Sequence, residues 1–310
     1  MPVTRPAHLV LALLSLAGPA QAQRPPLPAG AEALSLRGEA LFATALAPAT
    51  LAGHQARLEE ARQLVFANPG DPEALIWFGR RTAYLGRYRD AIAIFTTGIA
   101  LHPRDARMYR HRGHRWLSVR EFDRAIVDFN GAVILVRGQP DQVEPDGLPN
   151  ARGIPTSTLQ SNIWYHLALS HYVKGDFAEA LPAWQEGMKV ATNPDMMVAT
   201  AYWLYMTLRR LGRDADAARV LEPITAGMDI IENTAYYRLL LLNKGLLTEA
   251  DLGMSGDALQ DASAGYGLGN WHFYNGRVEE ARRIWARIVA GGNWAAFGFI
   301  AAEAELVRGW

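Results

Sequence analysis

The sequence predicts an all-α protein in which antiparallel helix pairs stack into a solenoid. The first observation is a repeat: "LGRYRDAIAIF", which begins at Leu85, returns 34 residues later as "VREFDRAIVDF" from Val119. A fixed period of this length is typical of helical-repeat proteins. The second observation is a three-to-four-residue spacing of apolar side chains around each copy, which is typical of amphipathic helices. Together they indicate a repeated helix–turn–helix unit.

The first complete unit illustrates the pattern. We expect one helix from Pro72 to a turn at Gly86, and a second from Tyr88 to Leu101 that ends before Pro103, because proline cannot continue a helix. Further copies are "KGDFAEALPAW" from Lys174, "LGRDADAARVL" from Leu211, "NGRVEEARRIW" from Asn275 and a weaker "KGLLTEADLGM" from Lys244.

Residues 1–22 have the layout of a cleavable secretory signal. A nearly unbroken apolar run from Leu9 to Ala17 is followed by the small-x-small ending Ala20-Gln21-Ala22, so cleavage is expected after Ala22. The run is much shorter than the roughly 20 residues of a membrane-spanning helix. The sequence therefore predicts an exported protein, periplasmic or secreted and of bacterial type, with no stable membrane insertion.

The rest of the chain divides by composition and period. Residues 138–160 contain four prolines and three glycines, which predicts a surface loop inserted between repeats. This loop either gates a groove or merely protrudes. The predicted segments are 23–71 (a linker and a divergent helix pair, Glu32–Leu46 and His54–Pro69), 72–137 (units 1–2), 138–160 (the loop), 161–292 (units 3–6) and 293–310 (a closing helix with a water-tolerant outer face).

Charge and cysteine content exclude several classes of function. The chain has 31 basic and 31 acidic side chains, and nucleic-acid partners usually require a large positive excess. It has no cysteine, hence no disulfide, thiolate metal site or thiol nucleophile. Common phosphate-binding, hydrolase and zinc-protease motifs are missing as well. We predict a non-enzymatic protein with no cofactor, no metal and no nucleic-acid partner.

The repeats resemble the tetratricopeptide repeat (TPR) family, in which small residues stand where two helices cross and aromatic residues fill the gaps. The small positions correspond to Gly79, Gly113, Ala168 and Gly269 in the first helices, and to Ala91, Ala125, Ala180, Ala217, Ala250 and Ala281 in the second. The aromatic positions correspond to Tyr88, Phe122, Phe177, Phe95, Phe129, Trp184, Leu221 and Trp285. The resemblance implies a right-handed α-solenoid, a TPR-like superhelix of about six units plus end helices.

The same resemblance implies that the first helices line a concave groove. At the matching positions stand Trp77, Arg80, Tyr84, Arg107, Arg110, His111, His114, Asn162, Tyr165, Tyr202 and Arg209. Arginine pairs with carboxylates in a bidentate manner, and tyrosine and tryptophan provide rigid contact area. We therefore expect a basic, aromatic groove that binds another protein or peptide through acidic groups or a terminal carboxylate.

Three alternatives stay open at this stage. The arginines from Arg104 to Arg115 are either a binding face or a solvated face, and His111 with His114 has the spacing for a metal site. A structural role through self-association of the Trp-rich C-terminal end is a second alternative. A glycan- or peptide-acting enzyme would require two facing carboxylates, for which Glu73 and Glu232 are the candidates.

Overall fold

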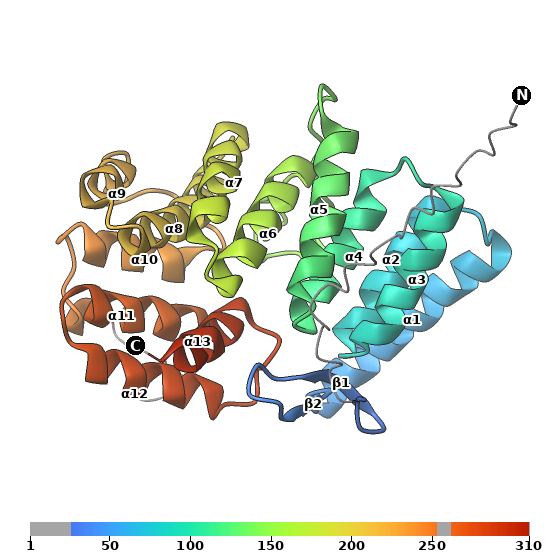
Figure 1. Ribbon diagram of the computed structural model, residues 1–310. Coiled ribbons are helices and arrows are strands. Elements are labelled where there is room, and N and C mark those ends of the chain that lie inside the picture. Colours follow the sequence, from blue (N-terminus) through green and yellow to red (C-terminus); the bar gives the residue numbers. More distant parts are fainter. Residues whose placement is uncertain (1–25, 253–261, 310) are drawn as a thin grey trace, which may run out of the picture.

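The computed structural model describes residues 26–252 and 262–309, and Figure 1 shows an all-α helical-repeat solenoid with one small sheet. The predicted signal segment lies outside the described residues. No helix in the described ranges is long and apolar enough to cross a membrane. The helices are α1 (Pro48–Ala67), α2 (Pro72–Tyr84), α3 (Tyr88–Leu101), α4 (Ala106–Ser118), α5 (Phe122–Val136), α6 (Leu159–Lys174), α7 (Phe177–Val190), α8 (Pro194–Arg210), α9 (Asp214–Leu221), α10 (Thr234–Asn243), α11 (Ala262–Tyr274), α12 (Val278–Val289) and α13 (Phe297–Arg308).

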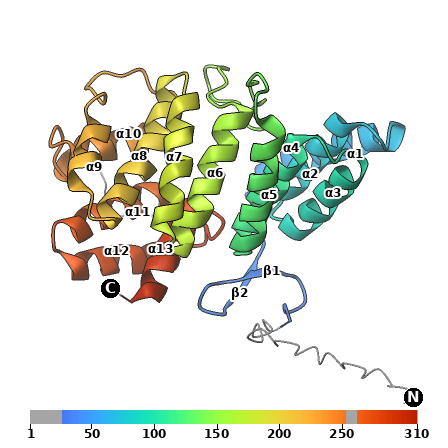
Figure 2. The ribbon, with the colours of Figure 1, turned by 45° about the horizontal axis from the view of Figure 1, so that its top comes forward.

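The small residues at the helix crossings have the role expected of them. A Cβ atom added to Gly79 would lie 2.5 Å from the ring of Phe95, and one added to Gly269 would lie 2.3 Å from Nε1 of Trp285. Gly79, Gly113 and Gly269 thus each receive the aromatic side chain of the second helix in their own unit. Figure 2 shows successive helices from α5 to α8 side by side, and this packing sets their spacing.

The turn inside each unit requires a left-handed backbone, and one unit meets this requirement in an unusual way. The second residue of the repeat is a glycine in five units, with φ between 68° and 91°: Gly86, Gly175, Gly212, Gly245 and Gly276. In the second unit it is Arg120, with φ of 66°. A side chain with a Cβ atom costs roughly 1–2 kcal/mol in this conformation. The guanidinium group of Arg120 contacts Glu303 and the carbonyl of Trp294, and these contacts supply a reason for retaining an arginine here.

The helix predicted for Glu32–Leu46 is wrong. This segment forms a two-stranded antiparallel sheet, β1 (Ala31–Leu34) and β2 (Ala40–Phe42), and only α1 of the expected helix pair exists. The alternating pattern of "AEALSL" suits a strand with one buried face, and Gly38 (φ 87°) provides the turn. The hairpin connects the two ends of the chain, because Nε1 of Trp294 donates to the carbonyl of Phe42 at 2.7 Å.

Two further predictions about the C-terminal half are wrong. Residues 244–252 do not form the second helix that was predicted for the fifth unit. They hold one 3-10 turn, Ala250–Leu252, in which Ala250 is exposed rather than packed at a helix crossing. The last two residues of this copy, 253 and 254, lie outside the described ranges. The closing helix α13 has no water-tolerant outer face over its first turns, because residues 298–305 are buried. It packs against α11, α12 and α6 rather than capping a free end.

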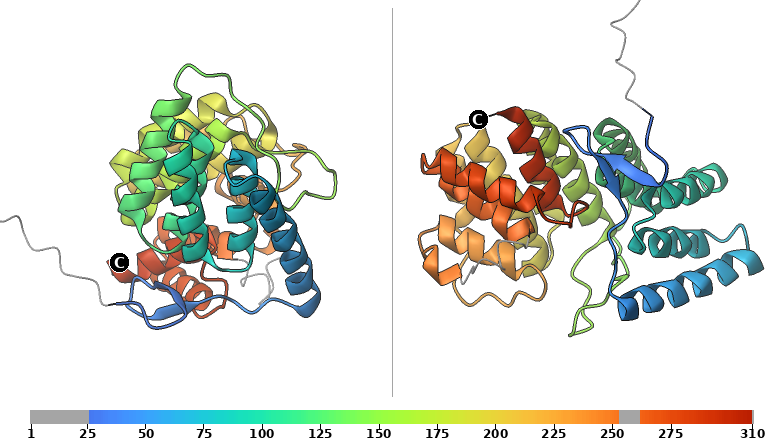
Figure 3. Two further views of the ribbon diagram at one scale, coloured as in Figure 1. Left: turned by 90° about the vertical axis from the view of Figure 1, so that its right-hand side faces the viewer. Right: turned by 90° about the horizontal axis from the view of Figure 1, so that it is seen from below.

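Two buried carboxylates fix α13 in place. Glu303, 0% exposed, accepts from the backbone N–H of Leu36 at 2.8 Å and lies 3.0 Å from Nη2 of Arg120. Glu305, 1% exposed, lies 2.9 Å from Nη2 of Arg210. One helix therefore connects the N-terminal hairpin, the second unit and the fourth unit, which closes the solenoid on itself (Figures 1 and 3).

Candidate functional site

Helices α2 and α4 bring the predicted basic residues onto one face. Asp105 caps α4 by accepting from the backbone N–H of Arg107 at 3.0 Å, which satisfies one of the free donors at the start of the helix. The three-to-four-residue spacing then places Arg107, Arg110 and His114 along the same side. Arg80 on α2 lines the same two small cavities as His111, so both helices contribute to one basic cluster.

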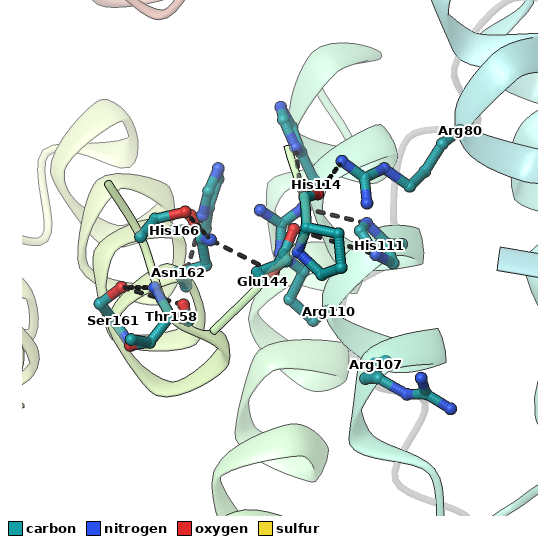
Figure 4. A network of polar contacts seen from close by, with 12 residues as sticks. Arg80, Arg107, Arg110, His111, His114, Glu144, Thr158, Ser161, Asn162 and His166 are labelled. Atoms are coloured by element: carbon teal, nitrogen blue, oxygen red, sulfur yellow. Dashed lines mark hydrogen bonds and ion pairs between the residues drawn. The ribbon is translucent and has the colours of Figure 1, made fainter. Parts of the chain in front are cut away.

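The center of this cluster holds a carboxylate from the inserted loop. Oε2 of Glu144 lies 2.9 Å from Nε of Arg110, and the two side chains are 11% and 8% exposed. Nδ2 of Asn162 on α6 donates to the same oxygen at 3.2 Å. Figure 4 shows Glu144 between Arg110 and Asn162. The predicted groove residues Arg110 and Asn162 thus bind a carboxylate that belongs to this chain.

Three histidines around Arg110 are held in the neutral form. Nη1 of Arg110 donates to Nδ1 of His111 at 3.1 Å and to Nδ1 of His114 at 3.4 Å, so both lone pairs point at a cation. Nδ1 of His166 lies 2.6 Å from the carbonyl of Asn162 and must carry the proton, because a carbonyl only accepts. Burial, reinforced by nearby arginines, lowers the pKa of all three histidines well below the usual value.

Positive charge exceeds negative charge around the smallest cavity of the cluster. This cavity of about 110 Å³ is lined by Arg80, Arg110, Arg115 and Glu144, among others. Neither Arg80 nor Arg115 forms an ion pair within 4 Å with a carboxylate of the described residues. Burial lowers the pKa of Arg115 to about 10, which leaves it charged at neutral pH. One carboxylate therefore faces three guanidinium groups.

A larger cavity adjoins the cluster and shares Arg110 and His114 with it. Its volume is about 340 Å³, and its walls come from α6, α8, α10, the inserted loop and the first residue of α13. The ring of Phe297 lies 5.2 Å from His114 and 5.4 Å from His166, between ring centers. The walls include the aromatic side chains Tyr165, Tyr236 and Phe297. The C-terminal helix therefore limits the groove from the side opposite the loop.

The other predicted residues have more varied positions. Trp77 lies beneath the guanidinium groups of Arg80 and Arg81, at 4.3 and 4.7 Å from the ring center. Arg107 forms ion pairs with Glu73 and Asp105, both at 2.7 Å. The hydroxyl of Tyr165 accepts from Nε1 of Trp203 at 2.7 Å. Tyr84, the third predicted site residue on α2, lines the 110 Å³ cavity.

Two predicted residues do not join the cluster. Tyr202 is 1% exposed and stacks on Tyr236 with ring centers 4.3 Å apart, so it belongs to the core. Nη1 of Arg209 donates to the hydroxyl of Tyr205 at 2.8 Å, and its guanidinium lies 4.7 Å from the ring center of Tyr274. These contacts place Arg209 between α8 and α11. Neither residue lines the small or the larger cavity.

The sequence did not identify Glu144 or Phe297 as site residues, and it indicated Arg115 only as part of the run from Arg104 to Arg115. For Glu144 a signal existed, since "DQVEPD" at 141–146 is an acidic stretch in a loop beside a basic helix. For Phe297 there was none, because its position depends on how α13 folds back. The enzyme alternative is weakened, because both candidate carboxylates already have partners. Glu73 on α2 is paired with Arg107 on α4, and Glu232 accepts from Thr156 of the loop at 2.6 Å.

The cluster is chemically suited to binding carboxylates. Within 26–252 and 262–309, no three histidine or acidic side chains are grouped to hold a metal ion. The lone pairs of His111 and His114 at Nδ1 already receive N–H groups of Arg110, which argues against their sharing a metal there. Arginine forks, an amide and neutral imidazoles form a preorganized anion-binding set.

Searches against family models and curated proteins return no match for this sequence. Among solved structures, the chain is similar to the TPR protein YrrB, described as having an unusual peptide-binding site (14% identity, 80% of this chain and 99% of that chain, TM-score 0.43). It is also similar to a TPR protein from Parabacteroides merdae (13%, 83% and 92%, 0.47) and to MamA (14%, 64% and 89%, 0.43). At this level of likeness no conclusion about function follows.

Proposed function

We propose that this chain is a non-enzymatic interaction protein that binds an acidic segment of a partner polypeptide in its concave groove, the face formed by α2, α4 and α6. The observation that carries the proposal is Glu144, a loop carboxylate that lies against Arg110 and Asn162. The excess of arginine over carboxylate around the 110 Å³ cavity supports the same type of ligand. No catalytic role is proposed for these residues.

Arg80 provides the test of this proposal, because it lines the cavity while Arg110 is too buried for a charge reversal. The mature chain is used to capture polypeptides from an extract of its own compartment. We expect Arg80→Glu to reduce the retained partner about tenfold, since a favorable charged contact becomes repulsive. The matched control is Arg283→Glu on α12, whose side chain is 72% exposed and pairs with Glu280.

Both variants are first checked by circular dichroism for native helix content. If Arg80→Glu and Arg283→Glu retain the same polypeptide as the unmodified chain, the partner binds outside the groove and the proposal fails. Loss of the partner in both variants would indicate a general effect of charge rather than a groove site.

We also propose that the chain is exported after cleavage behind Ala22, a proposal supported by the composition of residues 1–22. In a bacterial host, the periplasmic fraction is expected to contain a chain whose intact mass corresponds to Gln23–Trp310. Ala22→Arg is expected to block processing, because the cleavage site requires small residues. A full-length chain from Met1 in the cytoplasmic fraction would contradict this proposal.

A further inference from the structure

The inserted loop, residues 138–160, occupies the groove instead of protruding from the surface; we call it the groove loop. Beyond Glu144, its outgoing limb offers backbone carbonyls to α2. Nη2 of Arg80 donates to the carbonyl of Pro145 at 2.8 Å, and Nη1 of Arg81 donates to that of Gly147 at 2.8 Å. A carboxylate followed by two carbonyl acceptors is the set of groups that a bound acidic peptide would present.

The return limb of the groove loop, residues 150–156, contacts the segment that precedes α10. Nη1 of Arg152 lies 2.7 Å from Oδ1 of Asp229, and Nδ2 of Asn150 donates to Glu232 at 2.8 Å. Thr156 donates to the same carboxylate. The loop therefore extends from α2 to the segment before α10, and Figure 3 shows it in green between the helices of the two halves.

Polar contacts, not an apolar core, hold the groove loop. Its large apolar side chains Val143, Leu148 and Ile154 are 60%, 56% and 44% exposed. Its two limbs pair through an isolated bridge between Val143 and Thr158. Such contacts can be replaced one for one by another extended segment with the same groups, whereas a buried apolar anchor could not be replaced without opening a cavity.

We infer that the groove loop is a built-in occupant of the partner site, and that a partner binds by replacing it with an extended acidic segment whose carboxylate takes the place of Glu144. This inference rests on the proposed function and specifies the partner's chemistry. Arg80 and Arg115, which form no ion pair with a described carboxylate, favor the exchange. A segment with two carboxylates can pair with one of them in addition to Arg110, whereas Glu144 is the one loop carboxylate that forms an ion pair with these guanidinium groups.

The test uses a fluorescent peptide of residues 141–148, DQVEPDGL, as the probe, and anisotropy as the readout. The hosts are the unmodified mature chain, Glu144→Gln, and a variant in which 143–157 is replaced by a short Gly-Ser linker. We expect the peptide to bind both altered hosts about tenfold more tightly than the unmodified chain, because the competing carboxylate is removed. A peptide with Gln at the position of Glu144 should bind about tenfold more weakly.

Several outcomes would overturn the inference. One is that the peptide fails to bind the folded Glu144→Gln chain; another is that the Glu and Gln peptides bind equally. Glu144→Gln keeps the test valid if the shortened variant does not fold. If partner capture depends on Arg80 but is the same for the unmodified chain and Glu144→Gln, the groove binds its partner without moving the loop. In that case the inference fails while the proposed function stands.

Discussion

Replacing Glu303 by Ala is expected to lower the free energy of unfolding by about 3–5 kcal/mol, the typical effect of removing one partner from a buried ion pair. Both side chains of the Arg120–Glu303 pair are 1% exposed, so water cannot substitute for the missing carboxylate. Burial already lowers the pKa of Arg120, an effect that Glu303 opposes. The variant also deprives the N–H of Leu36 of its acceptor. Urea unfolding followed by circular dichroism measures the change.

The matched control for this variant is Glu279→Ala on α12. The side chain of Glu279 is 83% exposed and lies 3.5 Å from Arg282, so we expect a change of about 0.5 kcal/mol or less. If Glu303→Ala and Glu279→Ala have similar effects, the buried pair does not hold the closed structure together. A broadened transition for Glu303→Ala alone would indicate that the two halves then unfold separately.

Acid is expected to destabilize the protein strongly, starting below about pH 6.5. His111, His114 and His166 have pKa values lowered by burial in the native state, whereas the unfolded chain binds protons with the ordinary histidine pKa. Between the two values the unfolded state holds more protons, so the free energy of unfolding falls as pH falls. A histidine that binds no proton in the native state contributes a loss of at most about 1.6 kcal/mol between about pH 6.5 and pH 5.

The charged surroundings reinforce this acid sensitivity. The charged and titratable groups that line the 110 Å³ cavity with His111 and His114 are Arg80 and Tyr84 from α2, Arg110 and Arg115 from α4, and Glu144 from the groove loop. With three arginines and one carboxylate, a protonated imidazole meets net repulsion. A total loss of about 3–5 kcal/mol would be a large part of the stability of an ordinary domain.

Urea unfolding at several pH values tests this prediction. A variant with His111→Gln and His166→Gln should lose much of the pH dependence, whatever its stability at pH 7.5, because two proton-binding sites of the unfolded state are gone. His102→Gln, at the end of α3 and outside the cluster, serves as the control. Parallel pH profiles for the unmodified chain and the double variant would show that other groups cause the acid effect.

The repeat and its periodicity predicted the paired helices, because each pair depends on local contacts with a fixed spacing. The helix expected for 88–101 is α3, and the glycine–aromatic crossings at Gly79 and Gly269 were identified from the sequence. The N-terminal hairpin was mistaken for a helix because "EALSLRGEALF" has apolar residues compatible with either period. Its turn at Arg37-Gly38 was the overlooked sign.

The site was only partly predictable for a different reason. The structure brings together five residues that two neighboring helices carry: Arg80, Arg107, Arg110, His111 and His114. Glu144 could not be placed, because a loop without periodicity gives no register against the helices that it contacts. Tyr202 and Arg209 were assigned to the groove from repeat positions, but the packing of α10 and α11 against α8 buries or redirects them.

The contact between Leu36 and Glu303 determines the order in which the chain can be completed. It joins residues 267 positions apart, and the bond from Trp294 to Phe42 spans 252. Repeat arrays usually fold by extension from neighbor to neighbor, with each unit adding to the last. Here the N-terminal hairpin, which the ribosome makes first, lacks its hydrogen-bond partners Trp294 and Glu303 until the last part of the chain emerges. We therefore expect rapid local folding steps followed by one slow closing step.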